Sequence, residues 1–164
     1  MNASEPAVLT IGHSTHGAGA FLALLRQHQV EAVADVRSSP YSQHTPQFNR
    51  EAIEQTLREA GVRYVFLGKE LGARAEDRSL YLNGRVQYGR LAQTQLFQSG
   101  LERVLRGAER YRIALMCAES DPSHCHRFWV ADALGEHGAD VLHIINEKEV
   151  REHPRNLFTY GMGE

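Results

Sequence analysis

The sequence has little of what marks several large classes of protein. Only two of its 164 residues are cysteines, so we do not expect the disulfide framework of a small secreted domain. A single bridge between Cys117 and Cys125 remains open, but we expect a reduced pair. No apolar run approaches the length of a membrane span, so no membrane association is predicted. Residues 1–7 lack the basic and apolar regions of a secretory signal, which favours a cytoplasmic protein.

An excess of charge of one sign is also missing, as are the usual cofactor fingerprints. The formal net charge is -2, which indicates no bulk attraction to nucleic acid or to an anionic membrane. The glycine motifs of phosphate loops and dinucleotide sites are absent, and no cofactor is indicated. The nine histidines include no His-x-x-x-His pair, and there is no Cys-x-x-Cys. A composite site of His13, Cys117 and His126 is conceivable, but we predict no metal.

Short apolar segments alternate with amphipathic ones along the chain. The apolar segments predict strands over residues 8–11, 32–36, 62–67, 113–116 and 141–145. Apolar residues at helical spacing predict helices over residues 18–28, 50–60 and 91–108, the last with a break near Ser99–Gly100, and another from Pro122 onward. Residues 68–90 are predicted to be a long loop, and the tail 146–164 has no clear period.

Capping signals support these boundaries. Asn49 is placed to cap the second helix, and Phe48 and Ile53 have the spacing of a hydrophobic staple. Gly61 is expected to end that helix in a left-handed conformation. Asp121 is expected to cap a helix whose first residue is Pro122.

This alternation predicts one α/β domain over residues 1–164. Short apolar strands separated by helices form a parallel sheet that is covered on both faces. Right-handed crossovers place the carboxyl ends of these strands at one edge. We therefore predict a three-layer α/β/α domain, Rossmann-like or flavodoxin-like, with a mainly parallel sheet of about five strands.

Polar or ionisable side chains follow four of the five predicted strands, and the fifth strand carries His143. Because the strands are parallel, these groups are expected around one crevice. Their convergence predicts an active or ligand-binding site. The segments are Gly12–Thr15, Asp35–Arg37, Gly68–Arg74 and Cys117–Glu119.

Several of these residues also have purely structural interpretations. Asp35 and Arg37 have the spacing of an ion pair at a strand end, and ligand contact is the alternative. His13 is suited either to the site or to a loop carbonyl. One of Ser14 and Thr15 is expected to start the next helix.

Glu70 is suited to a surface pair with Lys69 or Arg74, and the crevice is its alternative.

The segment Cys117–Arg127 contains the strongest candidates for chemistry. Cys117 follows a strand and faces a predicted helix start, which favours a thiolate, whereas Cys125 shares the core-facing side of the helix and is expected to be packed. Glu119 is suited to act as nucleophile, general base or hydroxyl acceptor. His126 and Arg127 lie on different faces of the helix, and Arg127 is suited to hold an anion or a carboxylate. The cysteine loops of phosphatases and rhodaneses are only loosely similar, because this loop is longer and lacks their glycines.

Ordered motifs run along nearly the whole chain: Thr10–Thr15, Asp35–Ser38, Pro46–Asn49, Glu70–Gly72, Met116–Glu119, Cys125–Arg127 and Val141–Ile144. In these motifs the chain resembles the family called "domain of unknown function 488". The resemblance implies a small cytoplasmic Rossmann-like domain, without implying a reaction. Ala73 stands where members often have a second glycine. The resemblance implies these site candidates: His13, Ser14, Thr15, Asp35, Arg37, Glu70, Cys117, Glu119, His126 and Arg127.

Three functions are compatible with these residues. The first is a hydrolase or transferase acting on a nucleotide, nucleoside or nucleic-acid base, with Asp35 on a ribose hydroxyl, Arg37 and Arg127 on phosphate, and Glu119 at the sugar carbon. The second is thiol-redox chemistry at Cys117. The third is a non-catalytic module that binds a ligand or a metal. The predicted loop mixes cations with aromatic residues, which suits a single-stranded or flipped-base ligand and equally suits a solvated loop: Arg74, Arg78, Tyr81, Arg85, Tyr88 and Arg90.

Overall fold

The central sheet has six strands within residues 7–154, the part of the chain that the computed structural model describes, with His124 described in its backbone only. The strand order is β3-β2-β6-β1-β7-β8. All neighbours pair in parallel except β7 and β8, which are antiparallel. The strands are β1 (Ala7–Gly12), β2 (Ala32–Asp35), β3 (Arg63–Phe66), β6 (Ile113–Cys117), β7 (Asp140–Ile144) and β8 (Val150–Glu152).

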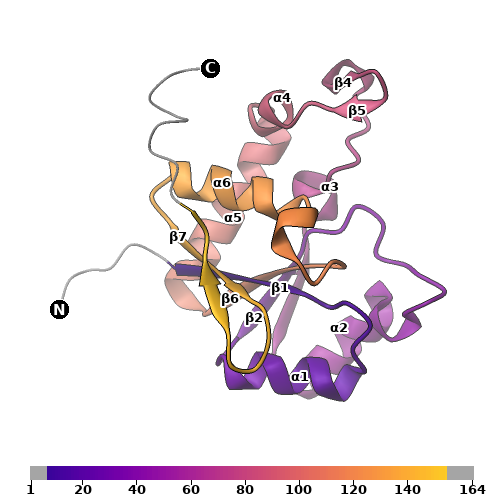
Figure 1. Ribbon diagram of the computed structural model, residues 1–164, viewed down its shortest axis with the longest axis vertical. Helices are drawn as coiled ribbons and strands as arrows, with labels where there is room; N and C mark the ends of the chain where they lie inside the picture. The colour runs from indigo at the N-terminus through magenta and orange to yellow at the C-terminus, as the bar shows by residue number, and fades with distance from the viewer. Residues whose placement is uncertain (1–6, 155–164) are drawn as a thin grey trace.

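Helices cover both faces of this sheet. One face carries α1 (Ala18–Gln27) and α2 (Arg50–Glu59), and the other carries α3 (Gly68–Leu71), α5 (Gln95–Arg110) and α6 (Arg127–Glu136). The sheet thus lies between α1 and α2 on one side and α5 and α6 on the other (Figure 1). Successive residues of β6 point to opposite faces, as the pleat requires. Ala114 and Met116 join the α1/α2 core, whereas Leu115 and Cys117 join the α5/α6 core. The predicted three-layer α/β/α class is confirmed.

The strand order differs from both forms that the pattern favoured. Numbered along the chain, the parallel strands lie in the order 3-2-4-1-5, whereas the Rossmann order begins 3-2-1-4-5 and the flavodoxin order is 2-1-3-4-5. The fourth strand, β6, is inserted between β2 and β1. The connection after β2 runs over the α1/α2 face and the connection after β6 runs over the other. Neighbouring strands whose connections diverge leave a crevice at their carboxyl ends.

The predicted loop 68–90 contains regular structure. After α3 come the 3-10 helix η2 (Arg78–Leu80), the hairpin of β4 (Tyr81–Leu82) and β5 (Arg85–Val86), and then α4 (Tyr88–Ala92). The predicted break at Ser99–Gly100 is wrong, because α5 runs through both residues. Gly100 instead permits close approach of α3, since a Cβ there would lie 2.7 Å from Glu70 Cβ. A glycine inside a helix marks a close contact here.

The helix predicted from Pro122 is also corrected. Pro122–His124 form a 3-10 helix, η3, and α6 begins only at Arg127. Asp121 caps η3 by accepting a hydrogen bond from the Ser123 amide at 3.0 Å.

At α2, Asn49 occupies the cap position, but its Oδ1 accepts from the Ser42 amide at 2.8 Å, so the predicted cap bond is not made. Phe48 and Ile53 are both fully buried, and Gly61 has φ +78° as predicted. The 3-10 helix η1 (Pro46–Phe48) precedes α2.

The predicted tail contributes β8 to the sheet, and residues 155–164 lie outside the described part. None of the described helices combines the length and apolar character that crossing a bilayer requires.

Candidate functional site

A pocket of about 290 Å³ lies beside the carboxyl ends of β2 and β6. We call it the β2/β6 pocket. It lies where the connections after these two strands diverge, the usual position of ligand sites in open α/β sheets. Its lining comes from the β2 end, the segment after α3, the first residue of α4, and the loop between β6 and α6. The lining residues are Arg37, Ser38, Ser39, Ala73, Arg74, Tyr88, Cys117, Ala118, Glu119, Cys125 and His126.

A buried ion pair supports the β2 side of the pocket. Asp35 is fully buried, and its two carboxylate oxygens accept hydrogen bonds from Arg37 Nε at 2.8 Å and Nη2 at 2.7 Å. Tyr64 donates its hydroxyl to Asp35 Oδ2 at 2.6 Å. Burial, together with the Asp35 charge, raises the pKa of Tyr64, so this phenol stays protonated. Asp35 thus neutralises Arg37 from beneath the pocket.

His13 completes this arrangement from the end of β1. Its ring stacks on Phe48 with centroids 4.4 Å apart. Nδ1 donates to the Ser14 carbonyl at 2.9 Å, so Nε2 carries the lone pair that faces Arg37 Nη1 at 3.3 Å. Burial lowers the pKa of His13, and the nearby Arg37 charge adds to this effect. His13 is therefore a neutral acceptor that holds Arg37 in place.

Arg127 fastens the loop that follows β6. Although fully buried, it donates from Nη1 to Thr10 Oγ1 at 2.7 Å. Its Nη2 donates to the carbonyls of Glu119 at 3.0 Å and Ser120 at 3.1 Å. Burial lowers the pKa of Arg127 to about 10, which keeps it charged at neutral pH. Gly12 lets the loop pass close, because a Cβ there would collide with the Glu119 carbonyl.

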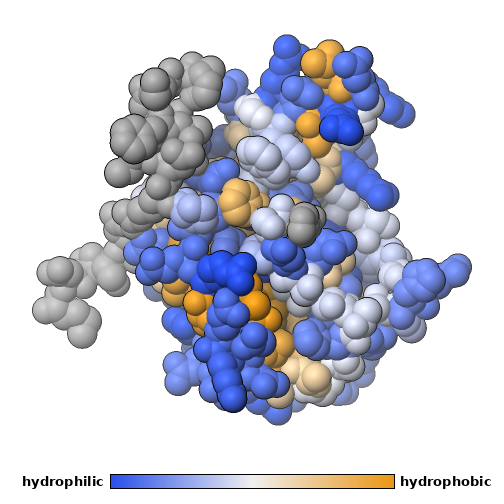
Figure 2. Space-filling view, viewed as in Figure 1, coloured by the Kyte–Doolittle hydropathy of each residue, from blue (hydrophilic) through white to orange (hydrophobic). Residues whose placement is uncertain are grey.

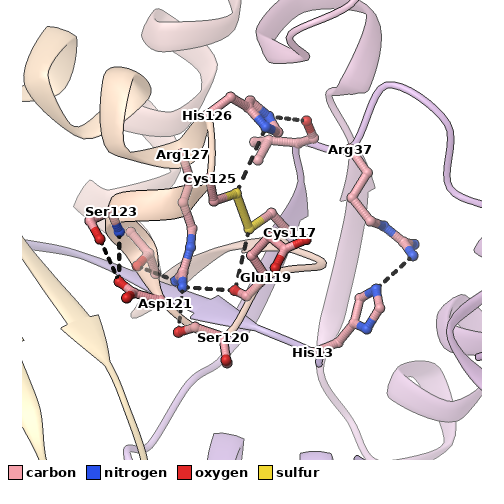
Figure 3. Close-up of a disulfide and its surroundings, with 12 residues drawn as sticks. His13, Arg37, Cys117, Glu119, Ser120, Asp121, Ser123, Cys125, His126 and Arg127 are labelled. Carbon is pink, nitrogen blue, oxygen red and sulfur yellow. Dashed lines mark hydrogen bonds between the residues drawn. A yellow bond between two sulfur atoms is a disulfide. The ribbon is translucent and has the colours of Figure 1, made fainter. Parts of the chain in front are cut away.

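Cys117 and Cys125 form a disulfide in the pocket wall (Figure 3), so the expected reduced pair is wrong. Their exposures also reverse the expectation. Cys117 is 1% exposed and belongs to the core, whereas Cys125 is half-buried and lies closer to solvent. His126 donates from Nε2 to the Val36 carbonyl at 2.7 Å, which leaves the Nδ1 lone pair 3.8 Å from Cys125 Sγ. Burial lowers the pKa of His126.

A family model described as "Domain of unknown function DUF488" matches residues 18–134. The chain belongs to this family. The matched span contains every residue that lines the β2/β6 pocket, whereas the motifs Thr10–Thr15 and Val141–Ile144 lie outside it. No curated protein and no solved structure shows a match to the chain.

The site residues predicted from the sequence of this DUF488 protein fall into three groups by their position relative to the β2/β6 pocket. Arg37, Cys117, Glu119 and His126 line the pocket together. His13, Asp35 and Arg127 lie behind it and hold the lining in position. Ser14, Thr15 and Glu70 are outside the lining.

Ser14 lies at the end of β1, where its amide donates to the Ala118 carbonyl at 2.9 Å. Thr15 is exposed in the turn that follows, and Glu70 on α3 pairs with Arg103 at 3.5 Å.

Sequence reasoning missed Tyr64, Ser39 and Trp129, which stacks on the pocket residue Tyr88. Tyr64 lies on the strand next to β2, and a polar-tipped aromatic residue there was the available signal. Among the side chains that the structure describes, no group of three His, Cys, Asp or Glu is arranged to hold a metal ion.

A series of hydrogen bonds runs from Arg127, behind the β2/β6 pocket, to Asp132 on α6. Thr10 accepts from Arg127 and so donates to His143 Nδ1 at 2.6 Å. His143 Nε2 then donates to His153 Nδ1 at 3.0 Å, and His153 Nε2 donates to Asp132 Oδ1 at 2.6 Å. His143 is neutral in this series, because its Nδ1 accepts from Thr10 while its Nε2 donates to His153.

This series of hydrogen bonds predicts that stability falls in mild acid. Burial, with the nearby charge of Arg127 and the electrostatic effects of His153 and Arg151, lowers the pKa of His143 to about 3. The unfolded chain binds this proton near the usual value of 6.5, so it takes up more protons than the folded protein between these two values. The free energy of unfolding should therefore decrease by about 2 kcal/mol from neutral pH to about pH 5. Urea unfolding across this range measures the slope.

His143→Asn should reduce the slope, and His44→Gln, at an exposed histidine, should leave it unchanged. Equal slopes in all three proteins would contradict the assignment to His143.

Proposed function

We propose that the β2/β6 pocket is the active site of a hydrolase or transferase that acts on a nucleotide, nucleoside or nucleic-acid base. One observation carries this proposal: a carboxylate, an exposed arginine, two serines and a histidine line a single pocket at the point where the sheet connections diverge. Its volume of about 290 Å³ is near the lower end of small-molecule sites, about 300 Å³. A compact substrate with an anionic group suits this lining.

Arg74 is the cation that we assign to the substrate's phosphate. Arg37 is neutralised by Asp35, and Arg127 is occupied by Thr10 and backbone carbonyls. Arg74 is exposed at the pocket, and its own amide donates to Ser38 Oγ at 2.9 Å. A planar, permanently charged guanidinium pairs well with phosphate oxygens.

Glu119 is the residue that we assign to the bond-breaking step. It is the carboxylate in the lining, and its backbone is held by Arg127. Carboxylates attack or stabilise the electron-poor sugar carbon as its bond to the base breaks, and the departing base takes the bonding electrons. In hydrolysis a water molecule supplies the hydroxyl that ends on the sugar carbon and the proton that ends on the base. Asp35 then serves as a positioning residue, because its oxygens are already engaged.

Glu119→Gln should lower turnover at least about 100-fold, the usual scale for loss of a catalytic acid–base group. The assay measures base release from a panel of nucleosides, nucleotides and damaged oligonucleotides. Glu109→Gln is the matched control, since Glu109 is exposed on α5 outside the pocket lining. Equal turnover in the two variants would remove Glu119 from the chemistry.

The disulfide favours thiol chemistry at the same pocket as a second candidate. A thiolate from a small-molecule or protein thiol attacks Cys125 Sγ, the more exposed sulfur, and Cys117 leaves as a thiolate. The first thiol is now bound to Cys125 as a mixed disulfide. A second thiolate attacks the sulfur of this first thiol, the two incoming thiols leave as a disulfide, and both cysteines are reduced. His126 Nδ1, 3.8 Å from Cys125 Sγ, is placed to accept the Cys125 proton in the reduced form.

After mild reduction, iodoacetamide should modify Cys125 at least about 10-fold faster than Cys117, and only above a pH set by its thiol pKa. Mass spectrometry of time points gives both rates. His126→Asn should slow modification of Cys125 and leave that of Cys117 unchanged. Equal rates at the two cysteines would argue against this candidate.

A further inference from the structure

A stacked aromatic pair lies at the rim of the β2/β6 pocket. Tyr88, the first residue of α4, and Trp129 on α6 have ring centroids 4.9 Å apart and planes inclined by 9°. Tyr88 also lines the pocket. Trp129 lies outside the lining and is 47% exposed. The pair thus extends an aromatic surface from the pocket to the solvent.

Trp129 is not needed to pack α6 against the sheet. The residues of α6 that enter the core are Val130, Ala131 and Leu134, together with Ala133. Tryptophan is enriched at contact surfaces, where part of its ring is packed and part is in water, and Trp129 is so placed beside a pocket. Tyr88 and Trp129 each cover one face of the other's ring, and the exposed part of the Trp129 indole is accessible to a ligand.

The segment that contains Tyr88 carries a net positive charge, whereas the chain as a whole is slightly negative. Residues 74–90 carry four arginines and two acidic residues, whereas the whole chain has a net charge of -2. Asp77, one of the two acids, is engaged by the amide and hydroxyl of Ser79. All four arginines are exposed, and the end of the molecule that carries the β4–β5 hairpin is mainly hydrophilic (Figure 2). Exposed cations beside an aromatic stack are the elements of a site for single-stranded nucleic acid.

We infer that Tyr88 and Trp129 form a stacking platform, and that the substrate is single-stranded nucleic acid. This inference rests on the proposed function, which places one nucleotide in the β2/β6 pocket. A neighbouring base stacks on the platform, and the flanking phosphates contact the arginines of residues 74–90. A free nucleotide fills the pocket and leaves Trp129 unused. A duplex keeps its base faces stacked and offers none to the platform.

Trp129 is the single tryptophan of the chain, so its fluorescence reports the platform directly. A short oligothymidylate should quench this emission on titration, because a base stacks on the indole. An abasic oligonucleotide of equal length, which carries only sugar and phosphate, should bind more weakly and quench little. A duplex of the same length should behave like the abasic strand.

Variants then separate stacking from charge. In anisotropy with a labelled oligothymidylate, Trp129→Ala should weaken binding about 5- to 150-fold, which corresponds to about 1–3 kcal/mol for loss of one base–aromatic stack. Trp129→Phe should recover part of this loss. Leu96→Ala is the control, since Leu96 is equally exposed at 47% but lies on α5 and is apolar. Affinity that is unchanged in Trp129→Ala would overturn the platform.

Thymidine monophosphate, measured by calorimetry, distinguishes this inference from the proposed function. If the monophosphate binds with dependence on Arg74 but the oligonucleotide binds no tighter, the pocket stands and the platform fails. If neither binds, the nucleotide function itself fails. Tighter oligonucleotide binding that depends on Trp129 supports both.

Discussion

Replacing Asp35 with alanine is expected to lower the free energy of unfolding by about 3–5 kcal/mol. The variant leaves Arg37, a residue that is only 7% exposed, without its carboxylate partner, and removes the acceptor of the Tyr64 hydroxyl. An unpaired charge at a nearly buried position costs far more than a lost surface ion pair. Urea unfolding followed by circular dichroism measures the change.

A double variant tests the reason for this loss. Asp35→Ala with Arg37→Met removes both charges and should be more stable than Asp35→Ala alone, because no buried charge remains unpaired. Tyr64→Phe, which removes one donor to the carboxylate and leaves both charges paired, should cost less, about 1.5–3 kcal/mol. If the double variant is no more stable than the single one, the Arg37 charge is not the cause.

Replacing Arg127 with methionine is expected to lower the free energy of unfolding by about 3–5 kcal/mol, since each buried acceptor left without its donor costs about 1–3 kcal/mol. Methionine keeps much of the side-chain volume but leaves Thr10 and the carbonyls of Glu119 and Ser120 without their donor. For a chain of this length the melting temperature should fall by roughly 6–20 °C. Calorimetric scans at fixed pH measure it.

The same variant should loosen the pocket before the fold melts. Hydrogen exchange of the His13 and Ser14 amides, which donate to the Cys117 and Ala118 carbonyls, should accelerate more than that of β2. Arg127→Lys keeps the charge but cannot reach three acceptors with a planar fork, so an intermediate loss is expected. Retention of full stability by Arg127→Lys would show that charge alone holds the loop.

The layers of this fold could be predicted because each helix and strand carries its own periodic signal. Met116 and Leu115 alternate between the two cores, and Phe48 and Ile53 occur at the spacing that closes the start of α2. The strand order could not be predicted. Whether β6 lies beside β1 alone or between β1 and β2 depends on contacts distant along the chain, which no local pattern encodes.

The position of the candidate site could be predicted, but not which of its residues line the pocket and which support it from behind. The carboxyl ends of the strands indicated where Arg37, Glu119 and His126 would meet. Whether a charged residue lines a pocket or supports it from behind depends on its side-chain partners. Asp35 and Arg127 are drawn inward by Tyr64 and by backbone carbonyls, and spacing alone cannot reveal such partners. The Cys117–Cys125 bridge escaped prediction because α6 begins later than expected, which leaves Cys125 on a turn.

The position of β1 limits where this protein can be shortened. The family match begins at residue 18, yet β1 pairs with β6 on one side and β7 on the other. A fragment cut to residues 18–134 would lack an interior strand and leave β6 with an open, apolar edge prone to aggregation. We therefore expect a fragment that folds stably to need β1, from Ala7 onward, and to extend to His153, whose imidazole contacts Asp132.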